Sequence, residues 1–357
     1  MRPDPHPVIV IGAGQSGLAA AHALRSVGLP PLVLEAGERP TGSWSRYYDS
    51  LHLFSPAGYS NLPGLPFGGD PDRYPGRDEV VQYLARFAEH LDVEIRTRTT
   101  VRSVEPDGDG FLVHTTAGDT LPTSAVVAAS GSFSRPFVPE LGQDGFSGQV
   151  LHSADYRNPS AHTGARVVVV GGGNSGVQIA DELTAASDVT LATRAPVTFT
   201  RQRIGGRDLH HWLKRTGFDL APPAVLRRLL RAPLVIDTGA YREAVSSGRL
   251  ERRPMFTRLD GDAVVWSDGS REHVDTVILA TGYRPALEYL HPLGALTGSG
   301  APLHSGGTST TRPGLVYTGL ELQRTFSSNT LRGVGRDAGH VARALATHVR
   351  RRSTVVG

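Results

Sequence analysis

The 357-residue chain contains no cysteine and a single lysine, Lys214. Without a thiol it can form no disulfide, thiolate nucleophile, CxxC redox pair or cysteine-ligated zinc site. Nearly all of its cationic residues are arginine, and the formal net charge is only +3. No arginine run is interleaved with aromatic residues as a base-stacking surface would be, so nucleic-acid binding is not expected.

Long apolar runs are also missing. No segment approaches the roughly 18 consecutive apolar residues that a membrane helix requires. Residues 1–7 are proline-rich and show no charged-then-apolar signal segment. We therefore expect a soluble, cytoplasmic protein, and the length fits two domains.

A glycine motif typical of nucleotide binding occurs twice. Apolar residues 8–11 and 167–170 each precede one copy, and the glycines are Gly12, Gly14 and Gly17, then Gly171, Gly173 and Gly176. In each copy the first glycine permits a tight turn, the second lets a pyrophosphate approach the backbone, and the third lets helix pack on strand. The pyrophosphate would lie on the N–H groups that begin the helix.

The two copies end in opposite charges. Glu35 and Arg194 each follow the first glycine of their copy by 23 positions. A carboxylate there accepts hydrogen bonds from a ribose 2′-OH, as in FAD or NAD, whereas a guanidinium suits the 2′-phosphate of NADPH, with NADH left as an alternative. Because NADPH has nothing useful to reduce in a second NAD, we expect FAD at the first site.

A second matched unit follows each motif. Residues 110–131 and 261–282 both predict a β-hairpin and then a buried strand that ends in small residues. The sequence thus predicts an α/β fold with two Rossmann-like domains in a glutathione-reductase-like arrangement. The FAD domain would be discontinuous, at 1–160 and 283–357, and the NADPH domain would span 161–282, with a cationic insertion at 195–258.

Periodicity predicts helices at 14–27, at 78–91 with Asp78 as the cap, and at 334–350. The aromatic, glycine- and proline-rich stretch 37–75 is expected to cover the flavin ring with Trp44 and His52. His210 and His211 are adjacent and cannot chelate like an i, i+4 pair, so a surface helix is expected there.

A third motif stands between the two copies. Phe146, Gly148, His152 and Tyr156 match FxGxxxHxxxY at every fixed position. This pattern resembles the fingerprint of flavin-containing monooxygenases, a branch of the class B flavoprotein monooxygenases. Residues 42–44, 50–55, 171–176 and 280–283 extend the resemblance, and the chain looks like a compact bacterial form. Baeyer-Villiger relatives more often end the motif with Trp followed by Pro or Asp, so Tyr156 and Arg157 favour the sulfur and nitrogen oxidisers.

The resemblance implies a mechanism. NADPH would reduce FAD, oxygen would form a C4a-hydroperoxyflavin sheltered by NADP+, and a thioether or amine would take the distal oxygen. The cofactor carries this chemistry, so the protein must supply a dry pocket, and no catalytic triad or metal site is expected. His152 is expected to couple linker geometry to NADPH binding rather than to act as an acid or base.

The resemblance also implies the site residues. For FAD they are Gly12, Gly14, Gln15, Ser16, Gly17, Glu35, Ser43, Trp44, His52, Val101, Ser130, Gly131, Asn329 and Leu331. For NADPH they are Gly171, Gly173, Asn174, Ser175, Gly176, Arg194, Thr281 and Gly282. The candidates to face the flavin are Phe54, His52 and Asn61, with Phe54 standing where many family members carry asparagine.

Other functions stay open at this stage. A Baeyer-Villiger-type ketone monooxygenase and an NAD(P)H:acceptor oxidoreductase without oxygenase activity both fit two dinucleotide sites, and a redox-sensing role would retain the fold without turnover. Disulfide reductases are excluded by the missing cysteines. The expected partners are oxygen and a small molecule, which could be a thioether, an amine, an indole-like ring or a ketone. A homodimer is left open.

Overall fold

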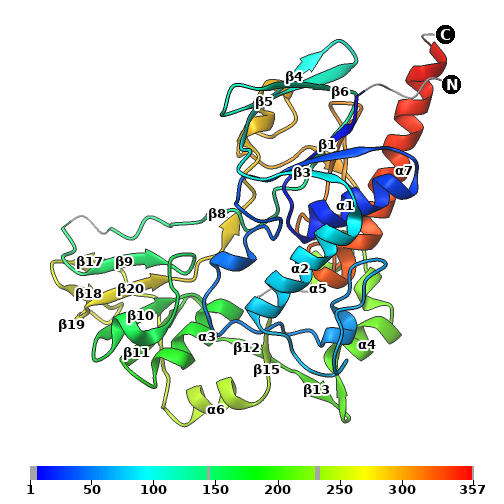
Figure 1. Cartoon of the computed structure of the whole chain (residues 1–357). Coiled ribbons are helices and arrows are strands. Elements are labelled where there is room, and N and C mark those ends of the chain that lie inside the picture. The colour runs from blue at the N-terminus through cyan, green and yellow to red at the C-terminus, as the bar shows by residue number, and fades with distance from the viewer. Residues whose placement is uncertain (1–5, 143–144, 230–233, 356–357) are drawn as a thin grey trace.

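The computed structural model describes residues 6–142, 145–229 and 234–355. Two sheets dominate it, a seven-stranded sheet with the order β22-β23-β24-β7-β1-β2-β3 and a five-stranded sheet with the order β16-β11-β10-β20-β9 (Figure 1). The expected α/β fold class is confirmed. Residues 1–5, 143–144 and 356–357 of the expected FAD domain, and 230–233 of the insertion, lie outside the described residues.

The first sheet is built from both ends of the chain. Its strands are β1 (Val8–Ile11), β2 (Pro31–Leu34), β3 (Glu94–Arg96), β7 (Val126–Ala128), β22 (His304–Ser305), β23 (Thr308–Ser309) and β24 (Leu315–Tyr317). β1 pairs in parallel with β2 and β7, and β24 pairs in parallel with β7. All four residues of β1 are buried, as expected for a short apolar run covered on both faces of a parallel sheet.

The second sheet repeats this core. Its strands are β9 (Gln149–His152), β10 (Arg166–Val170), β11 (Asp188–Thr193), β16 (Glu251–Pro254) and β20 (Thr276–Leu279). β10 pairs in parallel with β11 and β20, as β1 does with its neighbours. β9 belongs to this sheet, so the chain enters the second unit upstream of residue 161.

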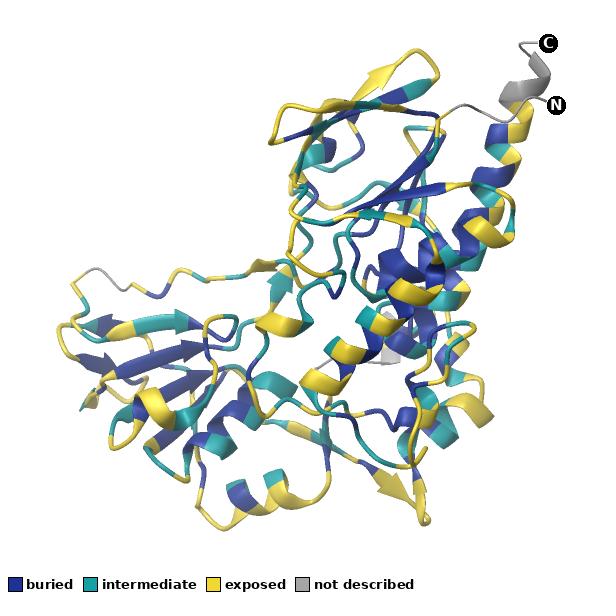
Figure 2. Cartoon of the chain, in the orientation of Figure 1, coloured by how far each residue is buried: buried dark blue, intermediate teal, exposed yellow. Residues whose placement is uncertain are grey.

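Helices cover the sheets. α1 (Gln15–Ser26), α2 (Arg77–Leu91) and α7 (Leu331–Val355) share a core with the first sheet, and α3 (Asn174–Leu183) packs on the second (Figures 1 and 2). The expectation that Asp78 caps α2 was wrong. The N-cap is Gly76, whose N–H donates to the Glu79 carboxylate at 3.0 Å, and Asp78 instead pairs with Arg77.

Each half carries a three-stranded antiparallel sheet, whose last two strands form the predicted β-hairpin. The first consists of β4 (Val101–Asp107), β5 (Gly110–Thr115) and β6 (Thr120–Thr123), and the second of β17 (Arg258–Asp260), β18 (Ala263–Val265) and β19 (Arg271–His273). A third pair, β8 (Arg135–Pro136) with β21 (Tyr283–Arg284), lies where the chain crosses between the two halves.

The cationic insertion folds as short elements that reach from α3 of the second half to the 37–75 loop and the start of α7. Its strands are β12 (Thr198–Arg201), β13 (Arg203–Ile204), β14 (Arg207–Asp208) and β15 (Leu234–Asp237), and its helices are α4 (Leu209–Arg215), α5 (Pro223–Leu229) and α6 (Ala240–Ser246). Single 3-10 turns complete the fold at Trp44–Arg46, Ala57–Tyr59, Pro159–His162, Phe218–Leu220 and Glu288–Leu293. Asp208 begins α4 by accepting a hydrogen bond from the His210 N–H.

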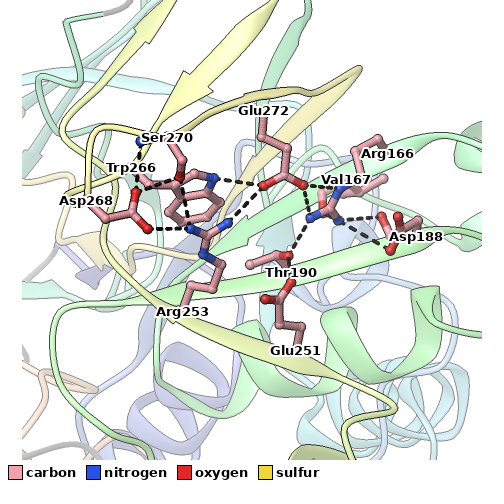
Figure 3. A network of polar contacts seen from close by, with 10 residues as sticks. All are labelled: Arg166, Val167, Asp188, Thr190, Glu251, Arg253, Trp266, Asp268, Ser270 and Glu272. Atoms are coloured by element: carbon pink, nitrogen blue, oxygen red, sulfur yellow. Dashed lines mark hydrogen bonds and ion pairs between the residues drawn. The ribbon is translucent and has the colours of Figure 1, made fainter.

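A polar network ties the edge of the second sheet to its hairpin (Figure 3). The Glu272 carboxylate accepts hydrogen bonds from Arg166 Nε at 2.5 Å, Trp266 Nε1 at 2.8 Å and Arg253 Nη1 at 3.2 Å. The Arg253 guanidinium also lies 4.0 Å from the centre of the Trp266 ring. Because Arg166 reaches Thr190 at 2.6 Å, the network spans β10, β11, β16 and β19.

Candidate active site

Both glycine motifs open onto a cavity of about 1440 Å³. The residues that line it come from the first turns of α1 and α3, from the 37–75 loop, from the insertion and from the start of α7. Ligand cavities commonly measure roughly 300–1000 Å³. The volume and the two motifs together provide room for more than one ligand.

The glycines are required by their surroundings. Gly12 has φ +104°, and a Cβ on Gly17 would lie 1.8 Å from the Gly12 carbonyl oxygen. The second motif repeats this geometry, with φ +138° at Gly171 and a Cβ on Gly176 placed 2.2 Å from the Gly171 carbonyl oxygen. Only glycine tolerates such approaches, so the two loops adopt the same local structure for the same reason.

The first turns of α1 and α3 fit a pyrophosphate. Their N-cap residues are Gly14 and Gly173, and neither helix has a side-chain cap. Both glycines line the cavity. The N–H groups that begin each helix are thus available for an anion, and the helix dipole favours negative charge there.

Glu35 is held in a fixed position beside the first glycine loop. It is 7% exposed, lines the cavity, and accepts hydrogen bonds from Ala13 N at 2.6 Å and Gly37 N at 2.8 Å. These two backbone donors fix the carboxylate beside the first glycine loop. Its remaining lone pairs can accept hydrogen bonds from a ribose hydroxyl.

Hydrogen bonds join three expected FAD residues that are far apart in sequence. The Gln15 side chain donates to the Asn329 carbonyl oxygen at 2.7 Å and accepts from Trp44 Nε1 at 3.1 Å. Gln15 begins α1, Trp44 lies in the 37–75 loop, and Asn329 precedes α7. The loop and the C-terminal segment therefore meet at the start of the first nucleotide helix.

The structure brings most of the expected residues to the cavity. Those that line it are Gly12, Gly14, Gln15, Ser16, Glu35, Ser43, Trp44, Phe54, Val101, Ser130, Gly131, Gly173, Asn174, Ser175, Gly176, Gly282, Asn329 and Leu331. Gly17, Gly171 and Thr281 are not among the lining residues. Arg194 is exposed just after β11, and no hydrogen bond or ion pair to it is found among the described residues.

Two candidates to face the flavin lie elsewhere. His52 is exposed, and its Nδ1 contacts the Ser50 carbonyl oxygen at 2.8 Å. Asn61 is also exposed, and its amide holds the loop by contacting Gly58 O at 3.2 Å and Phe67 N at 2.7 Å. Both side chains hold the 37–75 loop and neither residue lines the cavity, whereas Phe54 does.

The linker motif is held by internal contacts. A Cβ on Gly148 would lie 2.6 Å from Phe146 Cζ, so the phenyl ring requires glycine at this position. Tyr156 is 1% exposed, and its hydroxyl donates to Glu182 of α3 at 3.0 Å. The motif thus connects β9 to the helix of the second nucleotide motif.

His152 reaches the cavity wall through a backbone contact. Ala154 N donates to Nδ1 at 3.1 Å, so the ring proton is on Nε2, which donates to the Gly282 carbonyl oxygen at 3.1 Å. Burial lowers the pKa of His152, which keeps the ring neutral. A neutral, fully engaged imidazole suits a positioning role.

Several residues of the cavity were missed by sequence reasoning. His210 was expected on a surface helix, yet it is 1% exposed and lines the cavity. Tyr47, Tyr48 and Tyr283 also line it, and the Tyr48 hydroxyl donates to Gln178 of α3. The aromatic composition of the 37–75 loop was the available signal for the first two tyrosines.

Each of the two main sheets carries a glycine motif that lines the same cavity. This arrangement is typical of oxidoreductases that bind two dinucleotides. Among the described residues, no group of three or more His, Asp or Glu side chains could hold a metal ion. No helix of the described chain has the length and apolar content that a membrane crossing needs.

Comparisons with known proteins agree with this class. The family model for pyridine nucleotide-disulphide oxidoreductases matches residues 9–215. An uncharacterized CzcO-like oxidoreductase from Geobacillus kaustophilus is 30% identical over 96% of this chain and 98% of that protein. The indole-3-pyruvate monooxygenase YUCCA1 of Oryza sativa subsp. japonica is 30% identical over 77% of this chain and 76% of that protein.

A solved flavin-containing monooxygenase from Stenotrophomonas maltophilia is 32% identical, with a TM-score of 0.82 over 96% of this chain and 98% of that one. The chain therefore belongs to the pyridine nucleotide-disulphide oxidoreductase family and, within it, is a flavin-dependent monooxygenase. The expected resemblance to flavin-containing monooxygenases is confirmed, and FAD with NADPH is the cofactor pair consistent with it.

Proposed function

We propose that the protein uses NADPH and oxygen to oxygenate a soft nucleophile, a thioether or an amine, with FAD at the first glycine motif and NADPH at the second. The observation that carries this proposal is the shared cavity, onto which both uncapped nucleotide helices open. Bound flavin would supply the reduction and activation of oxygen. The chain's own contribution is binding, orientation and the exclusion of water.

The FAD site rests on Glu35 and the start of α1. Glu35 would hold the ribose, and the N–H groups after Gly14 would hold the pyrophosphate. The contacts from Gln15 to Trp44 and Asn329 brace the loop and the α7 segment on either side of this helix start. This bracing would keep the flavin from shifting during the reaction.

The insertion supports an apolar substrate. Its cavity residues include Leu209, Leu213 and Phe218, which face the same cavity as Phe54 and Phe326. An apolar wall lowers the local water content and strengthens any polar contact made inside it. A thioether or an uncharged amine fits such surroundings better than a strongly solvated substrate.

The test is oxygen incorporation. Purified protein loaded with FAD would be given NADPH, ¹⁸O₂ and, separately, a methyl aryl sulfide, a tertiary amine, a cyclic ketone and indole-3-pyruvate. The proposal expects a sulfoxide or N-oxide that carries one ¹⁸O per NADPH consumed. A lactone as the main product would favour the ketone monooxygenase. Hydrogen peroxide alone with every substrate would overturn oxygenation and favour the acceptor oxidoreductase.

A further inference from the structure

A buried histidine in the wall of the cavity, His210, has no role in the function proposed above. His210 is 1% exposed, lines the cavity and stacks on Phe54 with ring centres 6.2 Å apart and an interplanar angle of 18°. It comes from α4 of the insertion, whereas Phe54 comes from the 37–75 loop. Two segments distant in sequence thus place an imidazole against the side chain expected at the flavin.

Asp208 fixes the orientation of this ring. One carboxylate oxygen of Asp208 lies 2.7 Å from His210 Nδ1 and accepts the His210 N–H, also at 2.7 Å. The other oxygen accepts from Tyr74 at 2.6 Å and from Gln202 at 2.8 Å. Burial raises the pKa of Asp208, but these hydrogen bonds outweigh it and bring the pKa to about 2. The ionised carboxylate therefore takes the Nδ1 proton of His210 as its donor.

The opposite nitrogen is left for a ligand. Because Nδ1 carries the proton in the neutral ring, Nε2 is an acceptor. No hydrogen bond to Nε2 is found in the part of the chain that the structure describes, and His210 is one of the residues that line the cavity. Gln202 joins the arrangement to the loop by donating to the Phe54 carbonyl oxygen at 2.8 Å. The acceptor is thus held rigidly beside the Phe54 ring.

The surroundings indicate the kind of donor. Trp212, Phe218 and Phe326 line the same cavity, and the last two rings pack edge to face at 5.4 Å. A flat aromatic ligand would gain contact with these rings. A ligand that also carries an N–H would satisfy Nε2, which would otherwise be an unpaired acceptor once water is excluded.

We propose that His210 is a substrate-contacting residue whose Nε2 accepts a hydrogen bond from an aromatic N–H, so that the enzyme prefers N–H heteroaromatic or arylamine substrates to their N-methyl analogues. This inference rests on the proposed function and extends its substrate class from thioethers and amines to N–H heteroaromatics. Asp208 is the positioning residue, because it acts only through the orientation and tautomer of His210.

The experiment measures binding rather than turnover. Indole and 1-methylindole would be titrated into the FAD-loaded protein by calorimetry. The wild type should bind indole about tenfold more tightly, the ratio expected when a buried acceptor is paired or left unpaired. His210→Phe should abolish that ratio while 1-methylindole binding stays within about twofold. His211→Phe, a change on the same helix at a residue that borders a separate small pocket, should leave the ratio intact.

Three results would overturn the inference: an unchanged ratio in His210→Phe, an equal loss of both ligands, or no binding of either ligand to the wild type. Asp208→Asn serves if the phenylalanine variant does not fold. It removes the charge but retains an oxygen for Tyr74, and it should reduce the ratio only in part. Oxygenation of the sulfide by the wild type would leave the proposed function standing whichever result is found.

Discussion

At the scale of single residues, charge and space decide what each motif can bind. Glu35 and Arg194 stand at matched positions after β2 and β11, yet Glu35 is 7% exposed and held by two backbone donors, while Arg194 is exposed. The carboxylate is positioned before any ligand arrives. The guanidinium is free to move onto a phosphate, which makes Arg194 the residue on which nucleotide preference should depend.

Arg194→Ala should therefore lower the ratio of kcat/KM for NADPH over NADH about 10- to 100-fold, since a charged hydrogen bond contributes roughly 1.5–3 kcal/mol. The measurement is steady-state oxidation of both nucleotides. Arg215→Ala removes the same charge from the end of α4 and should leave the ratio unchanged. Equal effects of the two variants would mean that NADPH is attracted only by the overall positive charge of this part of the protein.

A substitution at Gly148 tests whether the linker motif requires glycine at this position. A Cβ there meets Phe146 Cζ at 2.6 Å and the Asp275 carbonyl oxygen at 2.9 Å. Gly148→Ala should lower the free energy of unfolding by about 1–3 kcal/mol, the usual effect of overpacking, as measured by urea denaturation. The matched change Gly298→Ala meets no atom within 4 Å and should cause no loss. Equal stability of the two variants would show that Phe146 moves away freely.

At the scale of elements, local patterns were predictable and long-range contacts were not. The strand, glycine turn and helix of each nucleotide motif lie within about 25 residues, so the sequence alone indicates them. The place of α4 depends on Tyr74 reaching Asp208, 134 positions later in the chain. For this reason His210 was expected at the surface. The hydrophobic periodicity of the insertion likewise did not indicate that its residues line the cavity.

The Glu272 network offers a test at this scale, because it joins β10, β11, β16 and β19 (Figure 3). Glu272→Ala should cost about 2 kcal/mol of stability, since it leaves Arg166, which is only 14% exposed, with the largely exposed Asp188 at 3.6 Å as its remaining carboxylate partner. Asp268→Ala removes a more exposed partner of Arg253 and should change little. Thermal melts of both variants give the comparison, and equal losses would contradict the ranking.

At the scale of the whole molecule, buried neutral histidines make the free energy of unfolding depend on pH. Burial lowers the pKa of His152 and of His162 below the ordinary value near 6.5. Below that pH the unfolded chain takes up protons that the folded protein does not, so the free energy of unfolding falls as the pH falls. Stability from this source is fully present above about pH 6.5.

The Tm should accordingly drop between pH 7.5 and pH 5.5, by roughly 2–4 °C for each kcal/mol lost. His162→Gln should make this dependence shallower, as scanning calorimetry at several pH values would show. The control is His273, whose pKa is raised by hydrogen bonds to Asp262 and Asp275, so its pH contribution has the opposite sign. A Tm that is independent of pH in the wild type would refute the argument.

The C-terminal part of the chain returns to the first sheet, and this determines which half of the protein can complete its folding first during synthesis. β24 pairs with β7, and α7 supplies Val334, Val341 and Leu345 to the core around α1. A ribosome finishes the second sheet, from β9 to β20, before either of these elements has emerged. The half built on the first sheet must therefore be completed last. A nascent chain halted near residue 330 would lack α7 and would expose the apolar side of α1 that α7 covers.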